Sequence, residues 1–282
     1  MPDDIPTYDV LVVGGGVVGC AVLWALAHYN LRLALCEAAP DVGQGISRAN
    51  TAIAHTGFDA PPGSLEARLV TAAHTGFAQL CDALSVGMRP CGALMLALSA
   101  ADMVQLDAYE KKAAANGIAT ERLNANAVHT QHPYIHPAAQ GALRIPGEAS
   151  VDSFGLTLAY AEVAALAGAH ILLDEPVAAI RAEDNALLVE TSRRRIRASY
   201  VVNAAGLAAA EIARMVGDDS FSITPRKGQL VVIDPASAPP IDTILLPTPS
   251  PTTKGMLITR RRMATCCLAP PPKTPATRAI GQ

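Results

Sequence analysis

A glycine-rich turn between two apolar runs constrains this chain more than any other feature. Within residues 8–37, an apolar run leads into Gly14, Gly16 and Gly19, a helical apolar pattern follows, and a second apolar run is closed by Glu37. This order of strand, glycine turn, helix, strand and acid is typical of a dinucleotide-binding βαβ unit. The pattern therefore predicts an α/β fold that begins with a nucleotide-binding motif.

Each position in this pattern has a physical reason. Gly14 permits a tight turn out of the first strand, Gly16 lets the backbone approach a pyrophosphate, and Gly19 lets the helix pack closely on the sheet. The helix N-terminus offers N–H groups and partial positive charge to phosphates. Glu37 is placed to accept hydrogen bonds from ribose hydroxyls. The alternative is an ordinary glycine-rich turn of an α/β protein.

Composition excludes several classes of protein. The 282 residues are 50% hydrophobic and carry a net charge of −3, which allows one large or two modest domains and gives no basic field for nucleic acid. The six cysteines include no CxxC pair, so we expect buried free thiols and a reducing compartment. The N-terminus lacks the basic region of a signal peptide, and no apolar run is long enough to span a bilayer. We expect a cytoplasmic protein and leave peripheral membrane contact open.

Helical periodicity and strand patterns continue along the chain. The helices expected from periodicity and capping residues span 65–84, 99–117, 154–167 and 207–216. The expected strands span 91–98, 141–145, 169–173, 176–181, 186–191, 196–203 and 225–233. The order predicts a nucleotide-binding unit interrupted by an inserted block, to which the chain returns before it enters the second domain again.

The chain resembles the FAD-dependent oxidoreductases of the D-amino-acid oxidase and glycerol-3-phosphate dehydrogenase family. Four segments, in this order, carry the resemblance: VVGGGVVG, SRANTAIAHTG, VVNAAGL and PRKGQLVVID. The resemblance runs over residues 8–259 and is greatest to soluble-type glycerol-3-phosphate dehydrogenase flavoproteins, with L-2-hydroxyglutarate oxidase a near relative. It implies a Rossmann-like FAD-binding domain with an interleaved antiparallel-sheet (α+β) substrate domain. The FAD-binding parts would span 1–80 and 151–219, and the substrate-binding parts 81–150 and 220–259.

The resemblance also implies a set of cofactor-binding residues. The first glycine turn would hold the FAD pyrophosphate, Glu37 the adenosine ribose, Val177 the adenine through its backbone, and four polar residues the pyrophosphate and ribityl side. Small residues near 205 would let the chain pass close to the cofactor. The full set is Gly14, Gly15, Gly16, Val17, Val18, Gly19, Glu37, Ser47, Arg48, Asn50, Thr51, Val177, Ala205 and Gly206.

His55 is the candidate base near the flavin ring. Oxidising an alcohol carbon requires a base for the hydroxyl proton, and histidine has a suitable pKa. The alternative is that His55 only packs beside the ring. Arg226 and Lys227 could bind an anionic phosphate or carboxylate, or they could form a solvated strand end.

Two further groups favour simpler interpretations. His132 and His136 suggest a metal pair, but their proline neighbours and the lack of further ligands favour a turn, so we expect no metal site. Arg193, Arg194 and Arg195 are most simply interpreted as a solvated hairpin turn.

The segment 260–282 departs from the family pattern. It is basic and proline-rich, and we expect an aberrant, disordered tail on a C-terminally truncated chain that retains FAD weakly. One choice of synonymous codons for residues 262–278, translated from the third base, gives DGNLLLGPTAEDTGDK, which resembles what relatives carry after the corresponding strand. A frameshift is therefore our hypothesis. An intact reading frame whose codons cannot give that string would exclude it.

Together these features predict an FAD-dependent oxidoreductase that oxidises a small anionic hydroxy compound by hydride transfer, with glycerol 3-phosphate first and L-2-hydroxyglutarate second. The electron acceptor is left open. The alternatives are amine or amino-acid oxidation on the same scaffold and an inactive truncated remnant. A nicotinamide dehydrogenase is disfavoured because SRANTAIAHTG and VVNAAGL would have no evident role in it.

Overall fold

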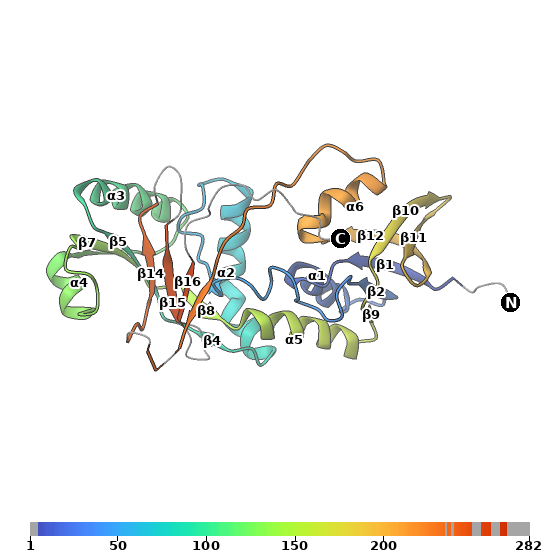
Figure 1. Ribbon diagram of the computed structural model, residues 1–282, viewed down its shortest axis with the longest axis horizontal. Coiled ribbons are helices and arrows are strands. Elements are labelled where there is room, and N and C mark those ends of the chain that lie inside the picture. Colours follow the sequence, from blue (N-terminus) through green and yellow to red (C-terminus); the bar gives the residue numbers. More distant parts are fainter. Residues whose placement is uncertain (1–4, 235, 238–239, 250–254, 261–265, 270–282) are drawn as a thin grey trace. The chain divides into compact units, whose positions relative to one another are not determined.

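The computed structural model describes residues 5–234, 236–237, 240–249, 255–260 and 266–269. Backbone packing separates the chain into two compact units, shown in Figure 1. The first unit holds the described residues of 1–50 and 153–225, and the second unit holds those of 51–152 and 226–276. The chain therefore leaves and re-enters each unit, as the sequence pattern predicts.

The first unit is a six-stranded sheet with helices on both faces. The strand order is β10-β11-β12-β1-β2-β9, parallel from β12 to β9 and antiparallel from β10 to β12. Its strands are β1 (Thr7–Val13), β2 (Leu33–Cys36), β9 (His170–Leu172), β10 (Val177–Glu183), β11 (Ala186–Thr191) and β12 (Arg195–Asn203). Its helices are α1 (Val17–Leu26), α5 (Ser153–Leu166), the 3-10 turn η1 (Gly206–Ala208) and α6 (Ala209–Met215).

Side-chain alternation along β1 places a different helix on each face of this sheet. Leu11 and Val13 belong to an apolar cluster that includes Ile212 of α6. Val12 points to the opposite face, where α1 approaches at Gly19. The nucleotide-binding pattern in the sequence is therefore confirmed as a buried parallel β1–α1–β2 unit.

The second unit is built on a seven-stranded sheet of order β13-β16-β15-β14-β5-β7-β6, in which only the β14–β5 pair is parallel among the described strands. The strands are β5 (Ala93–Ala97), β6 (Glu121–Asn124), β7 (Gly141–Ile145), β13 (Val231–Ile233), β14 (Ile244–Pro247), β15 (Leu257–Arg260) and β16 (Cys266–Ala269). A small sheet of order β3-β8-β4 adds β3 (Ile53–Ala54), β4 (Met88–Arg89) and β8 (Ala149–Val151). The helices are α2 (Leu65–Ala83), α3 (Ala100–Ala115) and α4 (Ala125–Gln131).

Alternation along β5 divides the core of the second unit in the same way. Met95 packs in a cluster with Leu106 of α3, whereas Leu94 packs in a second cluster with Val128 of α4. The α3 and α4 helices therefore cover opposite faces of the large sheet. The predicted α/β fold with an interleaved, mainly antiparallel second domain is confirmed.

The boundary between the units lies at Asn50, whereas the sequence analysis placed it at residue 80. Residues 51–80 pack with the second unit. Ala54 pairs with Ala149 across the β3–β8 ladder, and the Asn116 Nδ2 atom donates to the Gly57 carbonyl oxygen at 2.8 Å. These contacts, rather than any composition shift, assign the segment to the second unit.

Two predicted elements require correction. The strand expected over 225–233 begins only at Val231, so Arg226 and Lys227 precede β13. The tail expected to be disordered from residue 260 contributes β16, which pairs with both β13 and β15. The expectation is therefore wrong for Arg260 and residues 266–269, because their backbones complete the sheet, while 261–265 and 270–282 lie outside the described residues.

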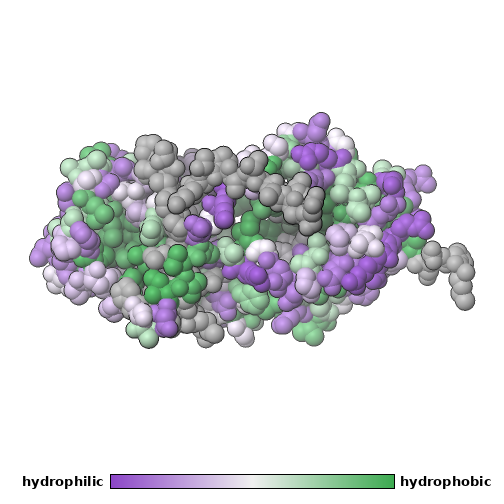
Figure 2. Space-filling model, viewed as in Figure 1, coloured by the Kyte–Doolittle hydropathy of each residue, from purple (hydrophilic) through white to green (hydrophobic). Residues whose placement is uncertain are grey.

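The β13 edge of the large sheet exposes apolar side chains. Val231 and Val232 of β13 are 50% and 63% exposed. Figure 2 shows apolar surface over β14 and β15 on the face that it draws. Among the described strands β13 is the last of this sheet, and an apolar strand at a sheet edge can pair with another strand.

Candidate functional site

The glycine turn of the first unit depends on close backbone packing. Gly14 has a φ of +108°, and a Cβ atom there would lie 2.4 Å from the carbonyl oxygen of Ala204. A Cβ at Gly19 would lie 1.9 Å from the Gly14 carbonyl oxygen. The expected roles of Gly14 in the turn and of Gly19 in close packing are therefore confirmed.

The N-terminus of α1 faces the loop that follows β2. Gly16 is the N-cap residue and has no side chain to cap the helix, and the first turn contains no acidic residue. The Ser47 hydroxyl accepts a hydrogen bond from the Val17 N–H at 2.8 Å. Val18, the next residue of the helix, is 63% exposed. The first turn of α1 therefore carries no acidic side chain of its own that would compete with a bound anion.

Glu37 lies beside this turn at the end of β2. Its two carboxylate oxygens accept hydrogen bonds from the N–H groups of Gly15, at 2.5 Å, and Ala39, at 2.8 Å. Each carboxylate oxygen has a second lone pair, so the group can still accept hydrogen bonds from a diol. The backbone thus fixes the orientation of the carboxylate, and the carboxylate can still accept further hydrogen bonds.

The other cofactor candidates are divided between the two units. Arg48 is exposed and donates to Gln44, whereas the Asn50 side chain donates to the carbonyl oxygens of Ile46 and Ser47 within the loop. Thr51 falls in the second unit. The loop residues of the first unit therefore support the turn around Ser47.

One return segment of the first unit, at Ala204 and Ala205, approaches the glycine turn. Val177 begins β10, and Gly206 has a φ of +57° at the start of η1. The Cα atom of Ala205 would lie 3.0 Å from a Cβ at Gly14. Ala204 makes the closest approach to that position and was missed by the sequence analysis, although the small residues around it were the available signal.

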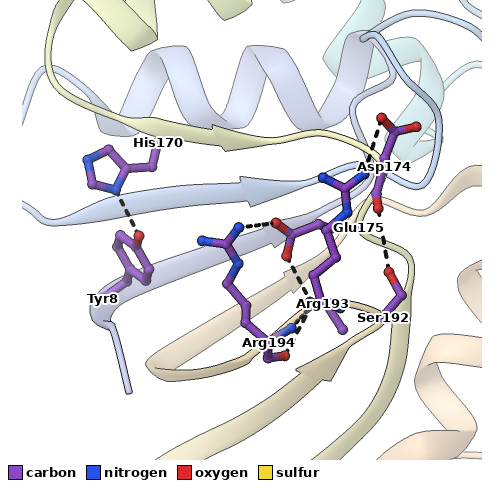
Figure 3. Close-up of polar contacts among 8 residues, drawn as sticks. Tyr8, His170, Asp174, Glu175, Ser192, Arg193 and Arg194 are labelled. Atoms are coloured by element: carbon purple, nitrogen blue, oxygen red, sulfur yellow. Dashed lines mark hydrogen bonds and ion pairs between the residues drawn. The ribbon is translucent and has the colours of Figure 1, made fainter. Parts of the chain in front are cut away.

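A buried carboxylate supports the segment before Val177. Glu175 is 2% exposed, and its Oε1 atom lies 2.7 Å from an Arg194 guanidinium nitrogen. The Thr191 hydroxyl donates to the other carboxylate oxygen at 2.9 Å, and the Glu175 N–H donates to the Glu37 carbonyl oxygen. Figure 3 shows Arg194 reaching Glu175 from the hairpin. The predicted hairpin over 192–195 is confirmed, but Arg194 has a specific partner and is not merely solvated.

The same carboxylate affects a neighbouring thiol. Burial, and next the negative charge of Glu175, raises the pKa of the Cys36 thiol to about 12, against an opposing effect of Arg194. A thiol whose pKa is raised on folding stabilises the fold below its unfolded pKa, and this contribution is lost as the pH rises through the folded value. Cys20 and Cys81 are also buried free thiols, as expected.

We therefore predict that stability falls above about pH 8.5, the ordinary pKa of a thiol. Cys36 should contribute a slope of up to about 1.4 kcal/mol per pH unit until about pH 12. Urea unfolding of the reduced protein at several alkaline pH values measures the slope. Lysines and tyrosines titrate in the same pH range, so the test compares the slope of unfolding free energy against pH in the wild-type protein with the slope in Cys36→Ala. Equal slopes in the two proteins would contradict the prediction.

His55 lies in the second unit, on a pocket of about 310 Å³. The pocket is largely apolar, and its titratable lining residues are His55, Asp59 and Glu66. The His55 side chain is 48% exposed, and its Nδ1 atom lies 3.0 Å from Oε2 of Glu148, which is fully buried. This arrangement joins an accessible imidazole to a fixed carboxylate, which is the combination that a general base uses.

The other candidates of the second unit lie elsewhere. Arg226 is exposed and is not among the residues that line the pocket with His55. The Tyr134 hydroxyl donates to Asp242 at 2.6 Å and lies 3.1 Å from His132 Nδ1, while His136 accepts from the Ala138 N–H. In the described part of the chain, no group of three or more metal-ligating side chains was found. The histidine–proline segment is thus held by a local hydrogen-bond network.

Comparison with known protein families decides the class of this protein. The sequence model of the family described as FAD dependent oxidoreductase (DAO) matches residues 9–276. The chain belongs to this family. The resemblance predicted from the four sequence segments is therefore confirmed.

The chain is similar in sequence and in structure to individual proteins of the DAO family. The chain is 33% identical over 253 residues to a glycerol 3-phosphate dehydrogenase of Caloramator mitchellensis, covering 89% of this chain and 53% of the relative. It is 27% identical to an L-2-hydroxyglutarate dehydrogenase of Escherichia coli (strain K12), covering 86% and 58%. The dithionite-reduced L-alpha-glycerophosphate oxidase of Mycoplasma pneumoniae with FAD bound superposes with a TM-score of 0.90 at 25% identity, covering 97% and 73%. This DAO-family chain spans about half the length of the curated relatives it matches.

The residues of the first unit fit the cofactor of the DAO family. The turn at Gly14 and Gly19 has no room for Cβ atoms, the first turn of α1 contains no acidic residue, and the Glu37 carboxylate is held by backbone N–H groups. These features suit a pyrophosphate and a ribose diol. No helix in the described residues is both long and apolar enough to cross a membrane.

Proposed function

We propose that this DAO-family chain carries out FAD-dependent oxidation of a small anionic hydroxy compound, with glycerol 3-phosphate the first candidate and L-2-hydroxyglutarate the second. The observation that carries the proposal is the pocket of the second unit on which His55 lies, its Nδ1 atom 3.0 Å from a buried carboxylate. The names of the similar dehydrogenases and the oxidase support the substrate class.

His55 is assigned as the general base. Its imidazole accepts the proton of the substrate hydroxyl while the adjacent carbon loses a hydride. When bound, FAD supplies the two-electron acceptor for this oxidation. Arg226 is assigned to the anionic group of the substrate, because a guanidinium can bind a carboxylate or phosphate through two hydrogen bonds. The electron acceptor that reoxidises the protein is not assigned.

The cofactor roles remain those proposed from the sequence. The first glycine turn would hold the pyrophosphate, and Ser47, Arg48, Asn50 and Thr51 would line the pyrophosphate and ribityl side; the residues of the turn are Gly14, Gly15, Gly16, Val17, Val18 and Gly19. Glu37 and Val177 would hold the adenosine, and Ala205 and Gly206 would allow close approach. The backbone-fixed carboxylate of Glu37 and the absence of acidic residues from the first turn of α1 support these assignments.

An absorbance spectrum of the purified chain tests the proposal first. A flavin band followed by anaerobic bleaching with glycerol 3-phosphate or L-2-hydroxyglutarate is the expected result. Absence of the band after addition of FAD would indicate an inactive remnant. A band that bleaches with neither compound would contradict the proposed substrate class.

His55→Gln should lower the rate of bleaching by about 10²-fold to 10⁴-fold, because general-base assistance contributes this much. The flavin band should be retained, since His55 is not one of the residues proposed to hold FAD. His129→Gln, on α4 in the same unit, is the matched control and should retain the wild-type rate. Equal rates in all three proteins would remove His55 from the mechanism.

One observation favours a second candidate, amine or amino-acid oxidation. Asp59 and Glu66 line the same pocket as His55, and two carboxylates favour a substrate that carries an ammonium group. Bleaching by small amino acids or amines, with full turnover retained in His55→Gln, would support this candidate over hydroxy-compound oxidation.

A further inference from the structure

The β3–β8 pairing brings His55 and Glu148 opposite each other. Ile53 pairs with Ser150 and Ala54 with Ala149, so His55 and Glu148 occupy the next step of the antiparallel register. The pairing joins residues that are far apart in the sequence. The contact between the two side chains is therefore fixed by the backbone and not only by side-chain rotamers.

Glu148 is a buried carboxylate whose two oxygens contact different residues. Its Oε1 atom accepts two hydrogen bonds from Thr56, one from the backbone N–H at 2.7 Å and one from the hydroxyl at 2.9 Å. Its Oε2 atom faces His55 Nδ1 at 3.0 Å, although the angle is poor for a hydrogen bond. A fully buried carboxylate is costly unless it is paired, so this geometry stabilises a donor at Nδ1.

The surroundings hold the carboxylate in place. A Cβ at Gly147 would lie 2.8 Å from the Thr56 side chain, so the 146–148 turn packs tightly against Thr56. The Glu148 carbonyl oxygen also accepts a hydrogen bond from the Gly92 N–H at 2.8 Å. The carboxylate therefore has little freedom to turn away from the imidazole.

We propose that Glu148 is a positioning residue that fixes the tautomer of His55. A carboxylate oxygen 3.0 Å from Nδ1 can accept a hydrogen bond there and cannot donate one, so it favours the neutral imidazole that carries its proton on Nδ1 and its lone pair on Nε2. Nε2 is then the atom that accepts a proton, and the same carboxylate stabilises the imidazolium that results. The role of this tautomer in catalysis rests on the function proposed above, whereas the tautomer itself does not depend on that function.

Glu148→Gln gives the sharpest test because it conserves shape and reverses one hydrogen-bonding role. The Thr56 N–H requires an acceptor, so the amide oxygen takes the place of Oε1 and the NH₂ group faces His55 Nδ1. Nδ1 must then accept, and the proton moves to Nε2. We expect the tautomer of His55 to be inverted in this variant.

Long-range ¹H–¹⁵N spectra of protein labelled with ¹⁵N-histidine report which ring nitrogen is protonated, and His55→Gln assigns the signal. The expected result is an Nδ1–H tautomer in the wild-type protein and an Nε2–H tautomer in Glu148→Gln. Glu175→Gln, which alters a buried carboxylate of the first unit, is the control and should leave the His55 signal unchanged. An Nε2–H tautomer in the wild-type protein would overturn the proposal even if Glu148→Gln did not fold.

Kinetics separates this inference from the proposed function. If both hold, Glu148→Gln should lower the turnover number by about 10²-fold or more while KM and the flavin spectrum are retained. An inverted tautomer in a protein that no substrate bleaches would refute the proposed function and leave the positioning role intact. Wild-type turnover in a Glu148→Gln variant that bleaches normally would overturn the positioning role instead.

Discussion

Replacing Gly19 with alanine is expected to lower the free energy of unfolding by about 3 kcal/mol or more and to abolish FAD retention. A Cβ at this position would lie 1.9 Å from the Gly14 carbonyl oxygen and 3.3 Å from Val12 Cγ1. Neither neighbour can yield easily, since one is backbone and the other belongs to a fully buried strand residue. Helix α1 would have to move away from β1.

That movement would affect binding as well as stability. The N–H groups at the α1 N-terminus, including the Val17 N–H that donates to Ser47, are placed by the contact between Gly19 and the turn at Gly14. Domain stability is typically only about 5–15 kcal/mol, so a loss of about 3 kcal/mol is a large fraction of it. The variant should therefore lose both the cofactor and much of its resistance to urea.

The matched control is Gly76→Ala in helix α2. Gly76 is exposed, and a Cβ there would meet nothing within 4 Å. Alanine should therefore stabilise the protein by about 1 kcal/mol, through helix propensity alone. Urea unfolding and flavin fluorescence after gel filtration measure both effects. Equal stability of the two variants would show that the close contact at Gly19 is not maintained in solution.

The sequence predicted the features that depend on local chemistry. The glycine spacing predicted the turn at Gly14 and the packing at Gly19, and the capping residue Ser99 predicted the start of a helix, because its side chain accepts a hydrogen bond from the first turn that follows it. These signals lie within a few residues of the structure that they specify. They need no knowledge of the rest of the chain.

The features that escaped prediction depend on contacts between distant segments. Nothing around Glu148 in the sequence indicates that a strand pairing will place it against His55. The strand beginning at Val231 was extended too far toward Arg226, because an apolar run alone does not show which residues have a neighbouring strand. Arg194 was interpreted as solvated because its partner, Glu175, lies on another segment.

The ion pair between Arg194 and Glu175 is the basis of the second prediction of a large loss of stability. Arg194→Met should lower the free energy of unfolding by about 3 kcal/mol, because removing one member of a buried ion pair leaves an uncompensated carboxylate. Among the described residues, the Thr191 hydroxyl would then remain as a side-chain donor to Glu175. The estimate is at the lower end of the usual range because the Arg194 side chain is 47% exposed.

Arg193 provides the control in the same turn. Its guanidinium lies 3.5 Å from the Asp174 carboxylate, and both side chains are about half exposed, at 54% and 49%. Exposed pairs typically contribute less than about 1 kcal/mol, so Arg193→Met should be nearly neutral in urea unfolding. If the two variants lose equal stability, the turn is stabilised by its net charge and not by the pair with Glu175.

A double variant distinguishes pairing from packing. Arg194→Met combined with Glu175→Gln removes the charge that Arg194→Met alone leaves buried, and should recover most of the lost stability. The amide can still accept a hydrogen bond from Thr191. Because the Glu175 N–H also donates to the Glu37 carbonyl oxygen, loosening this pair should weaken FAD binding in Arg194→Met and restore it in the double variant. Recovery of stability without recovery of FAD binding would show that Arg194 acts on the cofactor site by a route other than Glu175.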